Sequence, residues 1–225
     1  MFKAALFDMD GVIVDTEPLH RSAYFKMFND INIDVSEELY ASFTGQSTQN
    51  ICKQIIDHFE LALGVPTLMQ LKRDYFKNLF DSDNSLQLLD GVLELIKDYH
   101  KNGMSLVLAS SASMENINRI FERFDLNNYF KAKISGADLK ESKPHPEIFQ
   151  KAAELSGQAT ADCFVIEDSS NGIEAAKAAG IFCVGYNSAH SKDQDYSKAD
   201  KVIMKFQDIS YSKLRRAQVY KQSYT

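Results

Sequence analysis

Six short runs of apolar residues, rich in branched side chains, recur along this chain, and several helical patterns lie between them. Runs this short and this apolar are typical of strands that are buried on both faces of a sheet. Their alternation with helices predicts an α/β fold with a Rossmann-like, doubly wound parallel sheet. The predicted strands are 4–7, 105–109, 132–134, 163–166, 182–184 and 202–204, and the predicted helices are 92–100, 114–124, 147–155 and 172–179.

The stretch from residue 16 to residue 83 differs, because it contains no convincing strand. Its apolar residues recur at helical spacing, in two series. We interpret it as a small all-helical cap domain, inserted after the first strand, with 81–85 as one connection back. The predicted organisation is an α/β catalytic core from 1–15 and 84–225 and a helical cap from 16–83. The two series are Ile51, Ile55, Phe59 and Leu63, then Leu68, Leu71, Tyr75 and Leu79.

Composition and charge exclude several classes of protein. The chain has 225 residues, 44% hydrophobic and 25% charged, which is enough to bury a core without an obligate protein partner. A net charge of −6 argues against a nucleic-acid surface, and we interpret the one basic stretch, 213–216, as a solvated helix face. Three cysteines without a CxxC pair indicate buried thiols in a reducing compartment. With neither a signal-peptide pattern nor a membrane span in the sequence, we expect a cytoplasmic protein that does not contact membranes.

Two aspartates, Asp8 and Asp10, stand where the first apolar run ends. Alternate side chains of an extended backbone share a face, so both carboxylates can converge on one metal ion or one phosphorus atom. Gly11 and the apolar residues after it indicate that the chain then turns tightly and folds back. Taken alone, an Asp-x-Asp at a turn is more often a solvated loop or a cation site than a nucleophile.

A run of hydroxyl residues follows the second predicted strand, at the side where open parallel sheets bind ligands. Ser110, Ser111 and Ser113 lead into a helix, and the hydroxyls and backbone N–H groups of such a helix start suit an anion. The simpler interpretation of this segment is a plain N-cap, in which Ser113 satisfies the first turn of the helix.

Two further segments carry charged residues. A lysine in a loop is usually solvated, but Pro144 restricts the backbone of Lys143 and would aim its side chain. Glu167 and Asp168 follow the predicted strand at 163–166, and two acids at a strand end suit a cation.

In order and spacing, these segments resemble the four motifs of the haloacid dehalogenase superfamily of phosphotransferases. The resemblance spans nearly the whole chain: 8–12 resembles the first motif, Ser110 the second, Lys143 the third, and Glu167 with Asp168 the fourth. Each motif is common alone, but the joint pattern is specific. The segments 15–20, 142–147 and 167–176 are similar to the branch of β-phosphoglucomutases and small-molecule phosphatases, whose members carry a helical cap at the position predicted above.

The resemblance implies a mechanism. Asp8 would attack phosphorus to form an aspartyl-phosphate, while Asp10 would protonate the leaving oxygen and later deprotonate water. With an ordinary pKa, Asp8 is already ionised at neutral pH. Its approach to a phosphate dianion at about 4 Å then costs roughly 4 kcal/mol per charge pair at an effective dielectric constant near 20. Cations must offset this repulsion.

The resemblance also implies a cofactor and its ligands. Mg²⁺ would be held by the Asp8 carboxylate, the backbone carbonyl of Asp10 and Asp168, with Glu167 close by. The transferring phosphoryl group would be held by Lys143, by Ser110 and Ser111, and by backbone N–H groups.

Substrate choice depends on residues of the cap. His20 and Tyr24 are four residues apart and would share a helix face near the joint between the domains, although Tyr24 could simply pack inside the cap. Gly45 and Gln46 fall in a loop that resembles the substrate-contacting loop of this branch. Where the mutases carry an arginine for a second phosphate, this chain has Thr48.

The missing arginine favours hydrolysis over isomerisation, because a mutase must bind a bisphosphate intermediate. We therefore predict a Mg²⁺-dependent phosphatase of a small phosphorylated metabolite, a sugar phosphate, and keep a β-phosphoglucomutase-like mutase as the alternative. A phospho-accepting receiver module uses similar residues, but it is half this length and has no cap. A non-catalytic metal-binding relative is disfavoured because all four motifs are intact.

Overall fold

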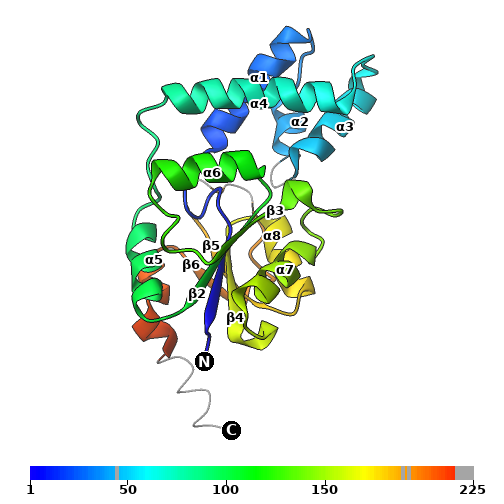
Figure 1. The fold of residues 1–225 in the computed structure, drawn as a ribbon. Coiled ribbons are helices and arrows are strands. Elements are labelled where there is room, and N and C mark those ends of the chain that lie inside the picture. Colours follow the sequence, from blue (N-terminus) through cyan, green and yellow to red (C-terminus); the bar gives the residue numbers. More distant parts are fainter. Residues whose placement is uncertain (44–45, 189–190, 192–193, 216–225) are drawn as a thin grey trace.

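The computed structural model describes residues 1–43, 46–188, 191 and 194–215. Within these residues, the centre of the molecule is a sheet of six parallel strands in the order β3-β2-β1-β4-β5-β6 (Figure 1). The first strand lies in the middle, and the chain crosses from one half of the sheet to the other after β3, as in a doubly wound fold. The strands are β1 Ala4–Phe7, β2 Ser105–Ser110, β3 Ala132–Ser135, β4 Cys163–Glu167, β5 Phe182–Tyr186 and β6 Lys201–Ile203.

Helices cover both faces of this sheet, and the alternation of side chains along each strand explains why. In β1, Ala5 and Phe7 belong to the apolar cluster that includes α5 and α6, whereas Ala4 and Leu6 belong to the cluster that includes α7 and α8. A strand that buries both faces must be apolar throughout, as the sequence indicated. The helices are α5 Val92–Lys101, α6 Met114–Arg123, α7 Glu147–Ser156 and α8 Ser170–Ala178, with short 3-10 turns at η1 Gly136–Asp138, η2 Thr160–Asp162 and η3 Phe206–Ile209.

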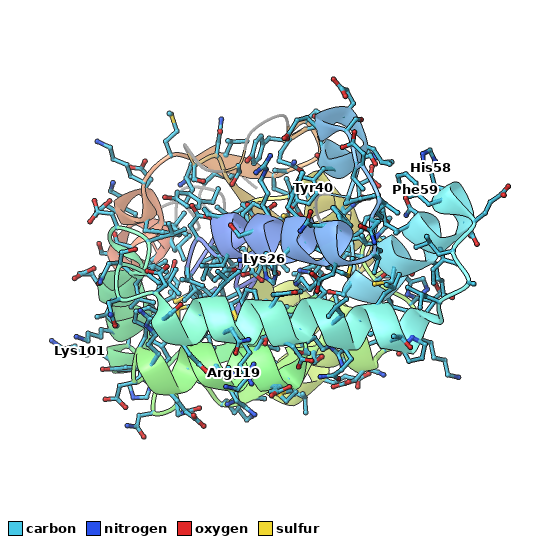
Figure 2. The ribbon with its side chains drawn as sticks, turned by 90° about the horizontal axis from the view of Figure 1, so that it is seen from above. Lys26, Tyr40, His58, Phe59, Lys101 and Arg119 are labelled. Carbon is cyan, nitrogen blue, oxygen red and sulfur yellow. The ribbon has the colours of Figure 1, made fainter. Side chains whose placement is uncertain are left out.

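Residues 17–82, here called the helical unit, lie above the carboxyl ends of the strands (Figure 1). Its described residues form four helices and no strand. α1 and α4 pack side by side, as the view from above also shows (Figure 2). The unit buries an apolar cluster of its own, which includes Phe28, Ile55 and Leu68. Its helices are α1 Glu17–Asp30, α2 Glu37–Ala41, α3 Thr48–Phe59 and α4 Val65–Ser82.

Serine side chains fix where four of the helices begin. Ser36, Ser47, Ser113 and Ser169 each accept a hydrogen bond from the backbone N–H three residues later. Such N-caps satisfy donors that the first turn of a helix leaves free. The plain N-cap interpretation of Ser113 is thus confirmed.

The α/β prediction is confirmed, with two local corrections. The sixth strand is Lys201–Ile203, one residue earlier than predicted, and Met204 is 71% exposed beyond its end. In α4 the fully buried side chains are Leu68, Lys72, Phe76 and Phe80, whereas the other members of the predicted series are only partly buried. Apolar residues that are three or four positions apart lie on the same face of a helix. In α4, tertiary packing buries the side chains that are four positions apart.

The core holds the end of α4, where the predicted connection begins. Arg123 of α6 donates to the backbone carbonyls of Phe80, at 3.1 Å, and of Asp83.

All three cysteines are buried free thiols. None of the helices in the described ranges is both long and apolar enough to span a bilayer.

Candidate active site

A cavity of about 440 Å³ lies where the carboxyl ends of the central strands meet the helical unit. β1 ends one residue before Asp8, β2 ends at Ser110, and β4 ends at Glu167. All three side chains line the cavity. Because parallel strands end at one edge of the sheet, motifs more than 100 residues apart converge there, as the sequence analysis expected.

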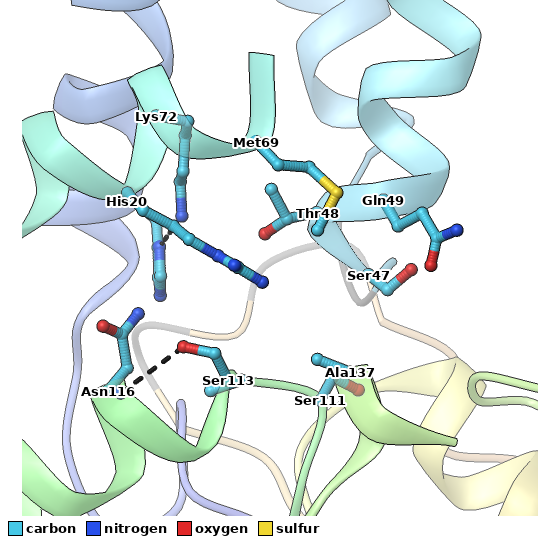
Figure 3. A pocket seen from close by; sticks show the side chains of 12 residues that line it. His20, Ser47, Thr48, Gln49, Met69, Lys72, Ser111, Ser113, Asn116 and Ala137 are labelled. Carbon is cyan, nitrogen blue, oxygen red and sulfur yellow. Dashed lines mark hydrogen bonds between the residues drawn. The ribbon is translucent and has the colours of Figure 1, made fainter. Parts of the chain in front are cut away.

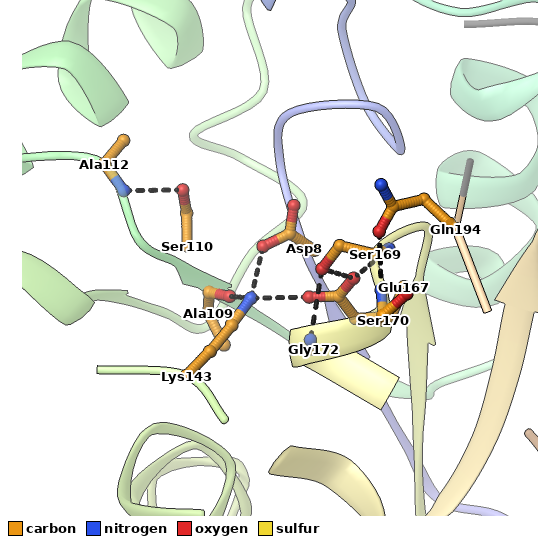
Figure 4. A network of polar contacts seen from close by, with 10 residues as sticks. All are labelled: Asp8, Ala109, Ser110, Ala112, Lys143, Glu167, Ser169, Ser170, Gly172 and Gln194. Atoms are coloured by element: carbon orange, nitrogen blue, oxygen red, sulfur yellow. Dashed lines mark hydrogen bonds and ion pairs between the residues drawn. The ribbon is translucent and has the colours of Figure 1, made fainter. Parts of the chain in front are cut away.

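Lys143 is buried at the floor of this cavity, between two carboxylates (Figure 4). Its Nζ donates to Asp8 Oδ1 at 2.5 Å, to Glu167 Oε1 at 2.7 Å and to the backbone carbonyl of Ala109 at 3.1 Å. Every proton of the ammonium therefore has an acceptor. The same Nζ lies 4.9 Å from the centre of the Phe149 ring. Lys143 is therefore a buried lysine, unlike the solvated lysines that are usual in loops.

Burial and charge act against each other at this floor. Burial raises the pKa of Asp8 to about 7, although Lys143 lowers it. The pKa of Asp168 is raised well above its ordinary value, by burial and then by the carboxylates of Glu167 and Asp8. Burial alone would lower the pKa of Lys143, but the two carboxylates outweigh it and keep the lysine charged. The expectation of an ordinary pKa for Asp8 is therefore wrong for the protein by itself, because the site is desolvated.

The turn after β1 brings Asp168 against the backbone of the first motif. Gly11 has a φ of +82°, and a Cβ on it would lie 2.0 Å from Asp168 Oδ2, so only glycine fits. The backbone N–H groups of Ile13 and Val14 donate to the carbonyl of Met9, which confirms the tight turn. Asp168 Oδ2 also accepts from the hydroxyl of Ser191, at 2.6 Å.

These groups fit a magnesium ion. The carboxylates of Asp8 and Asp168 and the carbonyl of Asp10 are hard oxygen donors, and the buried carboxylates outnumber the one lysine among them. In the described part of the chain, no three acidic, histidine or cysteine side chains converge closely enough to hold a metal by themselves. Such a site suits Mg²⁺, which keeps several waters and takes oxygens from substrate phosphate.

Glu167 has protein partners for both carboxylate oxygens. Oε1 accepts from Lys143, and Oε2 accepts from the backbone N–H of Ser169 at 2.8 Å and from its hydroxyl at 3.0 Å. A Cβ on Gly172 would lie 1.7 Å from Glu167 Oε1, so the start of α8 closes around this side chain. Glu167 is thus placed to position Lys143.

The loop after β2 faces the cavity. Ser110 is buried, and its Oγ accepts from the backbone N–H of Ala112 at 3.1 Å. The hydroxyl proton of Ser110 remains available to a ligand. Ser111 and Ala112 line the same cavity.

Asp10 stands at the wall of the cavity, next to α1. Its Oδ1 accepts from the hydroxyl of Thr16 and lies 4.0 Å from Nε2 of His20. Nδ1 of His20 is 2.6 Å from Nζ of Lys72 (Figure 3). An ammonium only donates, so Nδ1 accepts and the neutral imidazole carries its proton on Nε2, toward Asp10. Burial, together with Lys72, lowers the pKa of His20 and keeps it neutral.

Burial also raises the pKa of Asp10, against the opposing effects of Thr16 and Lys72. A carboxyl with a raised pKa is suited to donate a proton near neutral pH, and the carboxylate left behind is suited to take one back. Asp8 lies beside Lys143 instead, so the two aspartates of the motif have different surroundings.

Lys72 and Thr16 are two residues of the site that the sequence pattern did not predict. Lys72 is 2% exposed, and its Nζ lies 4.8 Å from the centre of the Tyr24 ring and 5.1 Å from that of Phe76. Burial lowers its pKa to about 8. In the sequence, Lys72 lies four residues from both Leu68 and Phe76, in an otherwise apolar series, and this spacing could have indicated that it is buried.

The predicted substrate residues of the helical unit partly reach the cavity. His20, Tyr24, Gln46 and Thr48 line it, and Gly45 lies outside the described residues. Tyr24 is buried in the apolar cluster of the unit and also lines the cavity, so it both packs and faces the cavity. The side chain of Gln46 is bonded within the helical unit, to Gln54 and to the carbonyl of Ser42.

A carboxylate beside a buried lysine, a second carboxyl beside a neutral histidine, and a further acid pair are typical of enzymes that act on phosphate esters. The chain belongs to the haloacid dehalogenase-like hydrolases, whose family model matches residues 5–186. It is a phosphoric monoester hydrolase with an α/β core.

Individual relatives agree with the assignment to this family. The chain is 30% identical to the phosphorylated carbohydrates phosphatase of Thermotoga maritima, over 84% of this chain and 86% of the relative. It is also 30% identical to the β-phosphoglucomutase of Bacillus subtilis, over 92% of each chain. Among solved structures, CbbY from Rhodobacter sphaeroides in complex with phosphate matches with a TM-score of 0.87 at 25% identity, over 96% of this chain and all of the other.

Proposed function

We propose that the protein is a Mg²⁺-dependent phosphatase of a sugar phosphate that works through an aspartyl-phosphate, with residues 16–83 as a cap over the site. The observation that carries the proposal is the unequal placement of the two aspartates. Asp8 is paired with Lys143 at 2.5 Å on the cavity floor, whereas Asp10 is held apart by Thr16 and faces His20.

In the first half of the reaction, an Asp8 carboxylate oxygen forms a bond to phosphorus as the bond from phosphorus to the ester oxygen breaks. Asp10 gives its proton to that leaving oxygen, and the sugar departs as an alcohol. In the second half, Asp10 takes a proton from water as the water oxygen attacks phosphorus, and Asp8 leaves as a carboxylate. Lys143 and the hydroxyl of Ser110, which line the cavity, would hold the negative charge of the transferring group.

Mg²⁺ would be held by the carboxylates of Asp8 and Asp168 and by the backbone carbonyl of Asp10. When bound, it supplies positive charge that offsets the repulsion between a carboxylate and a phosphate and favours the ionised form of Asp8. Glu167, whose oxygens both have protein partners, is assigned to positioning Lys143.

Sugar phosphates are supported as substrates by two of the relatives, one of which is named a phosphatase of phosphorylated carbohydrates and the other a fructose-1-phosphate phosphatase. The second candidate is a β-phosphoglucomutase-like mutase, which the relative from Bacillus subtilis favours. The uncharged Thr48, at the position where the mutases carry an arginine, supports hydrolysis. Three free, buried thiols support a cytoplasmic location.

A panel of sugar phosphates with and without Mg²⁺ tests the proposal. We expect release of inorganic phosphate that needs Mg²⁺ and is lost in Asp8→Asn. Asp10→Asn should lose most turnover while Mg²⁺ binding, measured by calorimetry, persists, because the backbone carbonyl is retained. Conversion to an isomeric sugar phosphate that depends on a bisphosphate activator, without net phosphate release, would establish the mutase instead.

A further inference from the structure

Tyr196, in the segment between β5 and β6, has no part in the mechanism above. It is half-buried, and it is not among the described residues that line the main cavity. Its hydroxyl donates to the backbone carbonyl of Asp168 at 2.9 Å and lies 3.3 Å from the carbonyl oxygen of Tyr186. The match to the family model ends at residue 186, so Tyr196 contacts the site from a part of the chain outside that match.

Asp168 lies where neither the sheet nor a helix holds it. In β4 the last residue that pairs with β5 is Glu167, and α8 begins only at Ser170. The carboxylates of Glu167 and Asp8 repel the carboxylate of Asp168. Because like charges push this side chain away from the site, contacts that fix its backbone oppose that displacement.

Residues 194–196, here called the clamp, supply such contacts. The side-chain oxygen of Gln194 accepts from the backbone N–H of Ser170 at 2.8 Å (Figure 4). The backbone N–H of Asp195 donates to the hydroxyl of Ser170 at 2.7 Å. Together with the bond from Tyr196 to Asp168, these contacts tie the clamp to the end of β4 and to the first turn of α8.

The clamp is itself fixed on the core. A Cβ on Gly185 would lie 2.8 Å from Cδ1 of Tyr196, so the tyrosine ring lies directly against the backbone of β5. A few residues later, Asp200 accepts from the backbone N–H of Cys183 at 2.7 Å and pairs with Lys177 of α8 at 2.6 Å. The stretch from Tyr196 to Asp200 is therefore anchored on β5 and α8, which keeps the tyrosine hydroxyl in place.

We propose that Tyr196 is a positioning residue for the metal site: its hydroxyl fixes the carbonyl of Asp168 and so keeps the Asp168 carboxylate where it can bind Mg²⁺. The inference rests on the proposed function, which assigns Asp168 as a ligand of Mg²⁺. The carbonyl carbon that Tyr196 holds is bonded directly to the Cα of Asp168, so a rotation of this peptide group displaces the side chain. Groups that orient a metal ligand through hydrogen bonds change the metal affinity when they are removed, although they never touch the metal.

Tyr196→Phe tests the proposal, because it removes the hydroxyl and keeps the ring against Gly185. Calorimetry of the full chain with Mg²⁺ alone, without substrate, measures the Kd. We expect the variant to weaken Mg²⁺ binding by about tenfold, which is the lower end for the loss of a group that orients a metal ligand. In the phosphatase assay, the Mg²⁺ concentration that gives half-maximal activity should rise by a similar factor. At saturating Mg²⁺, kcat should stay within about twofold of the wild type, because mass action refills the site.

Tyr211→Phe is the matched control. It removes the same hydroxyl from a tyrosine that is not among the described residues lining the cavity, where the hydroxyl lies 4.0 Å from the Met1 sulfur. Its Kd for Mg²⁺ should equal that of the wild type. Urea unfolding of both variants separates positioning from a structural role. A loss of stability in Tyr196→Phe with an unchanged Kd would show that the tyrosine only supports the segment, and would overturn the inference.

The inference and the proposed function fail in different ways. If no sugar phosphate is hydrolysed but the Kd of Tyr196→Phe is about tenfold weaker, Tyr196 positions the metal site and the proposed phosphatase activity fails. If the wild type is a Mg²⁺-dependent phosphatase and Tyr196→Phe has the same Kd and the same Mg²⁺ dependence, the proposed function stands and the inference is overturned. A wild-type protein that binds no Mg²⁺ would overturn both.

Discussion

The substitution Lys72→Met should stabilise the protein and impair the enzyme. Lys72 is almost completely buried, and burial lowers its pKa from 10.5 to about 8. That change corresponds to about 3 kcal/mol by which keeping the lysine charged disfavours the folded state at pH 7. Methionine fills a similar volume without the charge, but the contact with His20 Nδ1 at 2.6 Å is lost, which costs about 1 kcal/mol. The expected net gain is about 2 kcal/mol.

The gain should depend on pH in a defined direction. The unfolded chain keeps the proton of Lys72 up to about pH 10.5, whereas the folded protein loses it near pH 8. Between these values the unfolded state binds more protons, so the stability of the wild type rises with pH relative to that of the variant. Near pH 9.5 the cost of the lysine falls to about 1 kcal/mol and the gain of the variant should vanish.

Urea unfolding at pH 7 and pH 9.5, for the wild type and for Lys72→Met, measures both quantities. The same samples should show a lower kcat in the variant, because His20 loses the group that fixes its tautomer and its proton no longer faces Asp10. Lys77→Met, at an exposed position of the same helix, controls for the change of residue type. A variant that is less stable than the wild type at pH 7, or a gain equal at both pH values, would refute the reasoning.

Three further predictions follow from contacts in the site. Gly11→Ala should lower the free energy of unfolding by about 1–3 kcal/mol and weaken Mg²⁺ binding, measured by calorimetry, because the new Cβ meets Asp168; unchanged Mg²⁺ affinity would contradict this placement. Glu167→Gln should lower kcat by about tenfold or more with little change in KM, since it frees Lys143, and loss of Mg²⁺ binding instead would make Glu167 a ligand. Asn50→Ala should raise KM by about two- to tenfold by removing the 3.1 Å bond to Ser142 that joins the helical unit to the core; the neighbouring Gln49→Ala serves as control.

Much of the architecture could be predicted from local patterns. The six apolar runs lie within two residues of the observed strands, because a strand buried on both faces needs an uninterrupted apolar run. The sixth strand begins one residue earlier than predicted, because an edge strand buries few side chains and its apolar pattern is weak. In β6, Val202 is 47% exposed and only Ile203 is buried. The start of α6 could be predicted in the same way, because Ser113 caps its own first turn, whereas α8 begins at Ser170, two residues before the predicted start.

By itself, the sequence determined the parallel sheet and the convergence of Asp8, Ser110 and Glu167, because strand ends in such a sheet must meet at one edge. Lys143 lies in a loop beyond the end of β3, and only the resemblance to the family predicted that it joins them. The sequence could not determine the surroundings of these groups, which come from distant elements. Burial raised the pKa of Asp8, and the choice between two helical stripes in α4 brought Lys72 to His20. Only the tertiary structure decided these points, because desolvation and pairing depend on what packs around a group and not on the residues beside it in the chain.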